Sequence, residues 1–457
     1  MLLERRKNGY NFHMSEIFKA YDVRGIYPEE INERLVEQIG RAYVEYTNAK
    51  RVAVGSDKRV SSPSLFAALI KGITEGGADV VDLGLLSTPM LYFASSKLDV
   101  DGAIMVTASH NPGEYNGLKF CKKNAVPIGL ASGLSEIRDI ALTNNFSKQE
   151  HTGHVTTHNI KTDYEKHMVA FADFKGKRFH LATDTAHAMG VLELPILRSL
   201  PGVALCGTLY DTLQLPGVCP HEANPLKTET LIELQHVVRK SKADIGIAYD
   251  GDADRIGFVD EQGRVVPMDL VTTLLAEALL PAHPKCTILY DLRSSRAVKE
   301  AIEKQGGIAH ESKVGHANIK KQMIEEGALL AGEVSGHYYF ALSGYIAEMG
   351  SLPAILLMNL MASSGKKLSE LVDAIKFYSH SGEINMEVSD APAVLAKVKE
   401  KYSDGKLSEL DGIKITYEDW WFSLRSSNTE PLIRLNLEAN TPELMQSKLK
   451  DVLELID

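Results

Sequence analysis

Runs of apolar residues at strand length alternate with amphipathic stretches along most of the chain. Residues 51–56 and 102–107 are short apolar runs, and residues 63–76 carry apolar side chains at helical spacing. Residues 80–84 and 88–97 continue the alternation, so this part of the chain has the order β-α-β-α-β. Such a series is best satisfied by a largely parallel sheet that helices cover. The pattern therefore predicts α/β architecture.

The same alternation recurs twice, and the end of the chain differs. Further strands are expected at 179–184, 244–250, 255–260 and 287–291, and helices at 230–240 and 270–280. The last segment has an alternating strand at 431–439, followed by a helix that Thr441 caps and Pro442 opens. We expect three related α/β domains with mixed, mostly parallel sheets and a smaller C-terminal α+β domain. The expected boundaries are 1–156, 157–262, 263–368 and 369–457, with the polar, aperiodic segment 143–159 at the edge of the first domain.

Charge excludes some classes of partner. The chain has 457 residues, of which 44% are apolar, and a net charge of −10. An acidic chain without a basic patch is a poor binder of nucleic acid, because that affinity comes from concentrated cationic charge. A small anionic substrate remains compatible if arginines cluster locally. We expect no nucleic-acid partner.

Cysteine usage and hydropathy indicate the compartment. The four cysteines have no paired spacing, which favours free thiols over disulfides or a zinc site. No apolar run reaches the roughly 18 residues that a membrane span needs. The charged N-terminal segment lacks the apolar core of a secretory signal. We expect a cytoplasmic protein without a membrane partner.

The first candidate chemistry lies in TASHNP, residues 107–112, directly after an expected strand. Ligands of open α/β sheets bind at the carboxyl ends of the strands, where this loop presents the hydroxyl of Ser109. Asn111 suits a tight turn and Pro112 stiffens it. The alternative is an ordinary turn. The spacing is not that of a hydrolase nucleophile elbow.

The second is DGDADR, residues 250–255, between two expected strands. Asp250, Asp252 and Asp254 point to one side if the loop is extended. Three like charges repel unless a cation lies between them, and hard oxygen ligands suit Mg²⁺ or Ca²⁺. An EF-hand is excluded because Arg255 stands where that loop requires glycine. A solvated acidic loop is the alternative.

The third is GEVSGH, residues 332–337. Glu333, Ser335 and His337 alternate, and together they supply a carboxylate, a hydroxyl and an imidazole. Sugar hydroxyls need both donors and acceptors, which this set provides. A glycine-rich turn is the alternative.

The fourth is RSSNTEP, residues 425–431, with Arg434 beyond it. Arg425 and Arg434 frame a run of hydroxyl and amide donors that suits a phosphate group. An ordinary turn with solvated arginines is the alternative. The order of the four loops, one in each expected domain, is more specific than any one loop: nucleophile, metal, polyol and phosphate.

In this order the loops resemble the α-D-phosphohexomutase superfamily, and within it the bacterial phosphomannomutase/phosphoglucomutase group. The resemblance runs from about Phe18 to Arg434. It implies four domains around a central cleft and a reversible phosphoryl transfer between hexose 6-phosphate and hexose 1-phosphate, with mannose and glucose as sugars. It also implies Mg²⁺ as cofactor, with glucose or mannose 1,6-bisphosphate as intermediate and activator. We further expect a monomer or a weak homodimer.

The resemblance also implies roles for individual residues. Ser109 would carry the phosphoryl group and give an oxygen to the metal, and His110 would orient its loop. Lys119, in NGLK, and His316, in KVGH, would be the candidate proton carriers. The metal would bind Asp250, Asp252 and Asp254. The implied substrate-binding residues are Tyr21, Arg24, Arg255, Arg293, Glu333, Ser335, His337, Arg425, Ser427, Asn428, Thr429 and Arg434.

Some positions depart from the family pattern. Ser56 stands where the family often has arginine, Arg293 where some relatives have lysine, and residues 183–190 lack a Gly-Asn-Gly. GEVSGH differs from the GEQSGH typical of phosphoglucosamine mutases, which argues against an amino sugar. The rival functions are a phosphoglucosamine mutase, a metal-assisted sugar phosphatase that uses Ser109, and a non-enzymatic sugar-phosphate sensor. Separate sugar and phosphate loops favour the mutase.

Overall fold

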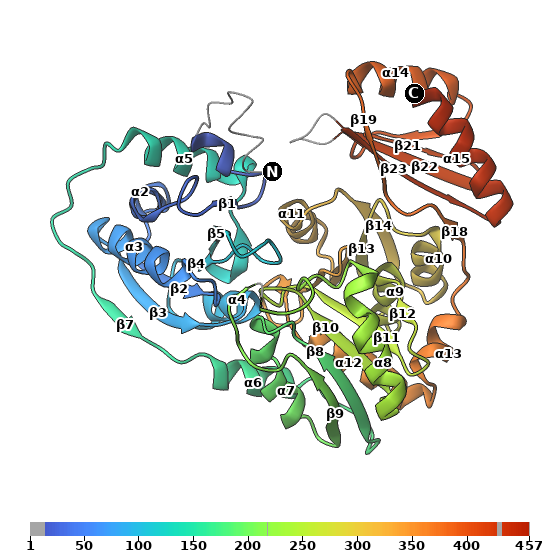
Figure 1. The fold of residues 1–457 in the computed structure, drawn as a ribbon, viewed down its shortest axis with the longest axis horizontal. Coiled ribbons are helices and arrows are strands. Elements are labelled where there is room, and N and C mark those ends of the chain that lie inside the picture. Colours follow the sequence, from blue (N-terminus) through green and yellow to red (C-terminus); the bar gives the residue numbers. More distant parts are fainter. Residues whose placement is uncertain (1–13, 217, 427–431, 457) are drawn as a thin grey trace. The chain divides into compact units, whose positions relative to one another are not determined.

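The computed structural model describes residues 14–216, 218–426 and 432–456 (Figure 1). The chain divides into two compact units. The first comprises Met1–Val266 and Ser335–Leu368, and the second comprises Pro267–Val334 and Ser369–Asp457. Each has its own clusters of buried apolar side chains. None of the helices in the described residues combines the length and apolar character that crossing a membrane requires.

The first sheet confirms the predicted alternation. Its strand order is β1-β5-β4-β2-β3-β7, with β6 paired to β5. Its strands are β1 (Val23–Ile26), β2 (Arg51–Ser56), β3 (Asp79–Leu85), β4 (Gly102–Val106), β5 (Tyr115–Lys122), β6 (Val126–Pro127) and β7 (Val155–Thr157). The helices with it are η1 (Met14–Ile17), α2 (Glu33–Thr47), α3 (Ser62–Glu75), α4 (Thr88–Lys97), η2 (Lys123–Ala125), η3 (Leu130–Ser132) and α5 (Leu134–Thr143).

Chain direction in this sheet decides where its helices pack. β2 pairs in parallel with both β3 and β4, whereas β5 runs antiparallel to β4 and β1. The connection from β2 to β3 and the return from β3 to β4 run in opposite directions across the sheet. Right-handed crossovers therefore place α3 and α4 on opposite faces. The loop after β4 emerges at the carboxyl edge of this sheet.

One strand of the first sheet lies where no strand is predicted. The polar segment 143–159 contains β7, which pairs in parallel with β3. All three of its residues are exposed, so no apolar alternation marks the strand. An edge strand that is held by hydrogen bonds and buries no apolar side chain leaves no hydrophobic signature.

The second sheet belongs to the same unit. Its order is β12-β11-β10-β8-β9, with β8 parallel to β9 and β10, and β10 antiparallel to β11. The strands are β8 (Phe179–Asp184), β9 (Val203–Leu209), β10 (Ile245–Tyr249), β11 (Ile256–Asp260) and β12 (Val265–Val266). The helices are α6 (Lys161–Val169), η4 (Met189–Leu192), α7 (Leu194–Ser199), η5 (Thr228–Leu231) and α8 (Ile232–Ser241). The antiparallel pair β16 (Tyr338–Phe340) and β17 (Ala347–Glu348), with the buried helix α12 (Leu352–Ser364), completes the unit.

The second unit holds the remaining elements. β13 (Thr287–Asp291) pairs in parallel with β14 (Ile308–Ser312) and β15 (Leu330–Gly332). The helices nearby are α9 (Met268–Leu279), α10 (Arg296–Lys304) and α11 (His316–Glu326). A further sheet has the order β18-β23-β22-β21-β20, with β19 paired to β23. It consists of β18 (Ser379–His380), β19 (Ile384–Glu387), β20 (Lys406–Ser408), β21 (Ile413–Thr416), β22 (Trp420–Ser426) and β23 (Leu432–Ala439).

The C-terminal part is the predicted α+β domain. Its helices are α13 (Leu368–Asp373), α14 (Ala391–Lys401) and α15 (Pro442–Ile456). The Oγ1 of Thr441 accepts a hydrogen bond from the Leu444 amide at 3.2 Å, which confirms the predicted cap. Val452 and Ile456 of α15 join the core over the antiparallel sheet. The fold class is therefore α/β with mixed sheets and a terminal α+β part, as predicted.

Candidate active site

The loop after β4 holds Ser109 in an unusual conformation. Its φ is 52°, in the left-handed region that serine rarely adopts, and only 4% of the residue is exposed. The Ser109 amide donates to Oγ1 of Thr107 at 3.0 Å. Its hydroxyl donates to Oδ2 of Asp250 at 2.7 Å. Such strain persists only where the surroundings enforce it, and it is typical of functional sites.

Arg59 supplies much of that enforcement. Its guanidinium donates to the backbone carbonyls of four residues of the loop: Ser109, Asn111, Pro112 and Tyr115. Asp57 accepts from Arg59 Nε at 3.1 Å and fixes its orientation. Arg59 and Ser109 lie 50 positions apart in the sequence. No local pattern predicts such a contact, and Arg59 is a site residue that sequence reasoning left without a role.

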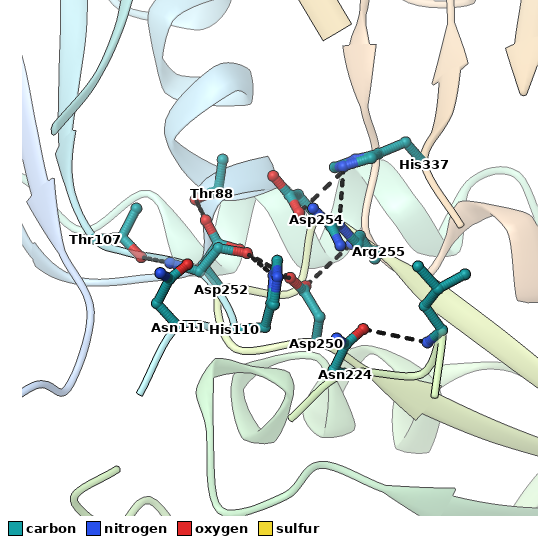
Figure 2. A network of polar contacts seen from close by, with 12 residues as sticks. Thr88, Thr107, His110, Asn111, Asn224, Asp250, Asp252, Asp254, Arg255 and His337 are labelled. Atoms are coloured by element: carbon teal, nitrogen blue, oxygen red, sulfur yellow. Dashed lines mark hydrogen bonds and ion pairs between the residues drawn. The ribbon is translucent and has the colours of Figure 1, made fainter. Parts of the chain in front are cut away.

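The three aspartates meet in the turn between β10 and β11. The carboxylates of Asp250, Asp252 and Asp254 are all buried and lie within 4.8 Å of one another. The loop is not extended as expected: the Asp250 amide donates to the Arg255 carbonyl at 3.2 Å, and Ala253 has a φ of 62°. The turn, rather than strand-like alternation, brings the carboxylates together. Figure 2 shows the three side chains and their neighbours.

Two side chains, one from strand β5 and one from the start of helix α4, reach this cluster. Lys119 of β5 donates to Oδ2 of Asp252 at 2.6 Å and to Oδ2 of Asp254 at 2.5 Å. The hydroxyl of Thr88 donates to Asp252 at 2.7 Å. Burial alone would lower the pKa of Lys119, but the two carboxylates outweigh it and raise that pKa. Lys119 is therefore an ammonium ion here.

The carboxylate cluster fits a divalent cation. Burial, then Asp254 and Asp252, raise the pKa of Asp250 well above its ordinary value. Three buried carboxylates so close together favour an additional positive charge. Their oxygens are the hard donors that Mg²⁺ prefers. Asp250, Asp252 and Asp254, joined by the Ser109 side chain, are thus suited to hold the ion.

Arg255 links the candidate metal loop, residues 250–255, to His337. Its Nε donates to Nε2 of His337 at 2.9 Å, so the imidazole accepts with that nitrogen. The other ring nitrogen lies 3.5 Å from Oε1 of Glu348 and 3.8 Å from Oδ1 of Asp254. Glu348 is a second site residue that sequence reasoning did not name. Ser335 lies half-buried in the turn before His337.

His110 contacts the candidate nucleophile as a neutral ring. Its Nδ1 lies 3.2 Å from Oγ of Ser109. Burial, then Arg255 and Arg24, lower the pKa of His110 to about 3. Arg24 also donates to Oδ1 of Asn111 at 2.6 Å, next along the loop. Tyr21 lies half-buried just before β1.

A cavity of about 440 Å³ opens beside this loop within the first unit. Ser109, His110, His187 and His221 are among the residues that line it. Hydrogen bonds to Asp184 and Cys219 raise the pKa of His221 to about 11. The three aspartates do not line the cavity, which therefore contacts the Ser109 loop on a side away from the carboxylate cluster.

The second unit gathers predicted residues around one carboxylate. Oε2 of Glu383 lies 3.2 Å from Nη2 of Arg425 and 3.9 Å from Nη1 of Arg293. Oε1 of Glu383 lies 4.0 Å from Arg434. Three guanidinium groups thus converge on a carboxylate, as they would on a phosphate. Ser427, Asn428 and Thr429 lie outside the described residues.

Glu333 and His316 lie in the same unit. Oε1 of Glu333 accepts from the Gly315 amide at 3.0 Å, directly before α11, which begins at His316. Arg293 pairs with Asp291 at 2.7 Å and lies 3.9 Å from Glu333. The alternation expected for Glu333, Ser335 and His337 does not describe the loop, because the chain turns after Glu333. A shared role on one sugar stays a prediction.

The chain matches four domain descriptions of one protein family, in order along the sequence. They are those of Phosphoglucomutase/phosphomannomutase: alpha/beta/alpha domains I, II and III at residues 15–148, 162–263 and 267–378, and the C-terminal domain at 383–455. The chain belongs to the phosphoglucomutase/phosphomannomutase family. This confirms the resemblance inferred from the four loops. As a member of this family the chain is a hexose-phosphate mutase, an isomerase.

Individual family members align over nearly the whole chain. A phosphomannomutase of Methanocaldococcus jannaschii is 39% identical over 452 residues, which cover 96% of this chain and 97% of the relative. A phosphomannomutase of Escherichia coli is 36% identical over 450 residues, with 96% and 98% covered. A crystal structure of a phosphoglucomutase/phosphomannomutase family protein from Burkholderia thailandensis superposes with a TM-score of 0.89 at 29% identity, covering 97% of each chain.

Proposed function

We propose that the enzyme interconverts hexose 6-phosphate and hexose 1-phosphate, with mannose and glucose as sugars, through a phosphoserine at Ser109. The observation that carries the proposal is the hydrogen bond of 2.7 Å from the Ser109 hydroxyl to Asp250, inside a buried cluster of three carboxylates. A hydroxyl at a cation site is placed to carry a phosphoryl group. The relatives named phosphomannomutase support the choice of sugar.

The proposed reaction conserves phosphate over two transfers. In the first, the P–O bond to Ser109 Oγ breaks, a bond forms from phosphorus to the free sugar hydroxyl, and the hydroxyl proton leaves to a protein base. The product is a hexose 1,6-bisphosphate. In the second, the other phosphoryl group returns to Ser109, and the sugar oxygen that loses it takes up the proton. The same bisphosphate, added from outside, would activate enzyme that lacks the phosphoryl group.

Asp250, Asp252 and Asp254 would hold Mg²⁺ together with an oxygen of the phosphoserine. When bound, the ion supplies positive charge that stabilises the charge on the transferring group. A solved N-acetylphosphoglucosamine mutase from Aspergillus fumigatus, of similar fold with a TM-score of 0.59 at 16% identity, was crystallised with GlcNAc-6P and magnesium. Arg255 would add a second positive partner. Arg59 and His110 would hold the loop while phosphorus moves.

Substrate recognition is assigned to the remaining predicted residues. Arg425 and Arg434, with Ser427, Asn428 and Thr429, would bind the phosphate that is not being transferred. Glu333, Ser335 and His337 would bind sugar hydroxyls. Tyr21, Arg24 and Arg293 would contact the substrate as well. Lys119 and His316 remain the two candidates for the proton carrier. As an ammonium ion, Lys119 can give a proton, and it could accept one only after losing its own.

The finer organisation is proposed on the same basis. The four domains would span 1–156, 157–262, 263–368 and 369–457, and the enzyme would act in the cytoplasm as a monomer or a weak homodimer. A phosphorylated hexose would be its partner, and neither nucleic acid nor a membrane would be one.

A coupled assay tests the proposal directly. Mannose, glucose and glucosamine 1-phosphates are supplied with Mg²⁺ and a hexose 1,6-bisphosphate, and formation of each 6-phosphate is followed. We expect turnover of the mannose or glucose compound and little of the glucosamine compound. Preference for glucosamine 1-phosphate would indicate the amino-sugar mutase instead. Steady release of inorganic phosphate in place of isomerisation would indicate the phosphatase.

A further inference from the structure

Glu193 is a buried carboxylate that the proposed reaction does not use. It lies between η4 and α7 and is 0% exposed. Its Oε1 accepts from the Ser87 hydroxyl at 3.0 Å. Its Oε2 accepts from the hydroxyl and the amide of Ser351 at 2.9 and 3.2 Å. One carboxylate thus joins the start of α4, the turn before α7 and the start of α12.

The approach of Ser351 to this carboxylate depends on a glycine. Gly350 has a φ of 47°, and a Cβ atom there would lie 2.6 Å from Oε2 of Glu193. A larger residue would be strained and would press against the carboxylate. The backbone at this point is therefore shaped to bring the Ser351 amide to Glu193.

Each joined segment also contacts the loop of residues 250–255 or Tyr249, the residue directly before it. Thr88, next to Ser87, donates its hydroxyl to Asp252 at 2.7 Å and its amide to the Asp252 carbonyl at 3.0 Å. Ser351 shares a hydrogen bond of 2.8 Å with the hydroxyl of Tyr249, which directly precedes Asp250. On the side of Glu193 itself, the Met189 amide donates to the Gly251 carbonyl at 3.2 Å.

We propose that Glu193 is a positioning residue that fixes the metal loop through Thr88, Tyr249 and Met189. The inference rests on the proposed metal site, whose ligands are the residues so held. Groups that orient metal ligands from behind change metal affinity without touching the ion. Glu193 is neither a metal ligand nor in contact with one of the three aspartates.

The protonation state of Glu193 decides which of its hydrogen bonds with Ser87 and Ser351 it can accept. Ionised, it accepts from all three donors; protonated, one of its oxygens must donate, so one serine contact has to reverse. The titratable groups that face it are Tyr164 and Tyr249, whose pKa values burial raises well above 10, so both stay neutral. Burial raises the pKa of Glu193 to about 7. Its support of the loop is therefore strongest above neutral pH.

Binding of Mn²⁺ alone, followed by electron paramagnetic resonance of the free ion, tests this without an activity assay. Purified full-length wild type is compared with Glu193→Gln, Ser351→Ala and Ser87→Ala. We expect Glu193→Gln to weaken Mn²⁺ binding about tenfold, the lower end for groups that orient ligands. Ser87→Ala should weaken it by about threefold, because it removes one hydrogen bond, and Ser351→Ala should weaken it further, because it removes the hydrogen bonds to both Glu193 and Tyr249. The difference between wild type and Glu193→Gln should grow as pH rises through about 7.

Glu438→Gln is the matched control. Glu438 is 0% exposed and accepts from the Trp421 indole at 2.8 Å in the second unit. This variant should lower the melting temperature and leave Mn²⁺ affinity unchanged. Equal affinity of wild type, Glu193→Gln and both serine variants would overturn the inference while leaving the metal site intact. If Glu193→Gln does not fold, unchanged affinity of the two serine variants would overturn it. Wild type that binds no Mn²⁺ would overturn the metal site and the inference with it.

Discussion

At the scale of single residues, the arrangement that suits the proposed reaction lowers the stability of the folded chain. Ser109 keeps a left-handed backbone, and Asp250 stays in a cluster of like charges that raises its pKa. Both states cost free energy, and Arg59 and Lys119 offset part of it through hydrogen bonds and charge. Ionised Glu193 likewise supports the metal loop at a cost in stability, and this cost can be measured from the pH dependence of unfolding.

Glu193→Gln should change how stability depends on pH. The pKa of Glu193 rises from 4.5 to about 7 on folding because of burial. The folded state holds the proton more tightly, so this stabilisation is complete below pH 4.5 and lost as pH rises through about 7. The loss in wild type amounts to roughly 3 to 4 kcal/mol, at about 1.4 kcal/mol per pKa unit. Urea unfolding across this range should show a smaller decline for the variant. Parallel profiles would contradict the assignment.

Site residues could be predicted where they lie in a short sequence motif. Ser109 and the three aspartates each lie in a short loop directly after a strand, and the structure places the Ser109 hydroxyl in a hydrogen bond with Asp250, within 4.8 Å of which lie the other two carboxylates. Arg59 and Glu193 could not be predicted, because their partners lie far away in the sequence and neither stands in a recognisable motif. Only the folded chain brings such groups together.

At the scale of elements, two loops pack backbone against backbone. A Cβ atom on Gly251, in the metal loop, would lie 2.1 Å from the carbonyl oxygen of Ser109. Glycine at this position therefore permits the contact between the loop after β4 and the loop after β10. The two loops cannot approach as they do with a larger residue there.

Gly251→Ala should separate these loops and reduce turnover by at least about tenfold, because Ser109, the proposed nucleophile, loses its contact with Asp250, a proposed metal ligand. The matched control is Gly113→Ala in the same Ser109 loop, where the nearest atom to a new Cβ would be the Pro216 carbonyl oxygen at 3.3 Å. Steady-state kinetics of both variants check this. Equal effects of the two substitutions would contradict the packing argument.

A second element-scale prediction concerns the turn between β18 and β19. Glu383 pairs with Arg425 at 3.2 Å, so a substrate phosphate has to compete with it for that guanidinium. Glu383→Gln should lower KM for the hexose phosphate at least about threefold, because the pair is only partly screened by solvent, without changing kcat. The control is Glu387→Gln, an exposed carboxylate on β19. A higher KM would mean that Glu383 orders the arginines for the substrate instead.

Elements with a buried face could be predicted closely, and those without one could not. β2, β4 and β10 are continuous apolar runs, and each lies where that pattern indicates. β7 has no buried residue and left no pattern. The metal loop shows a third case: its residue types predict a cation site, but the turn that gathers them depends on backbone hydrogen bonds that composition does not reveal.

At the scale of the whole molecule, the net charge of −10 does not attract an anionic sugar. Attraction has to come from local groups, such as Arg293, Arg425 and Arg434 in the second unit. In the first unit, by contrast, carboxylates dominate the cluster beside Ser109. We expect binding of the phosphate there to need the divalent cation.

Removal of divalent ions should therefore stop the enzyme. We expect a chelator to reduce turnover by at least about a hundredfold, because Lys119 and Arg255 alone do not neutralise the three carboxylates that the phosphoryl group would face. Addition of Mg²⁺ in excess of the chelator should restore the rate, which the coupled assay follows. Full turnover in the chelated enzyme would exclude the metal site.

The most direct test is to locate the phosphoryl group on the intact protein. The enzyme is incubated with a hexose 1,6-bisphosphate labelled in phosphorus, and the labelled residue is identified by peptide mass spectrometry. We expect label on Ser109 that passes to added hexose phosphate. We expect none on Ser109→Ala, whose turnover should fall at least about a hundredfold. An unlabelled Ser109 in an enzyme that still isomerises hexose phosphates, or a Ser109→Ala variant of wild-type rate, would contradict it.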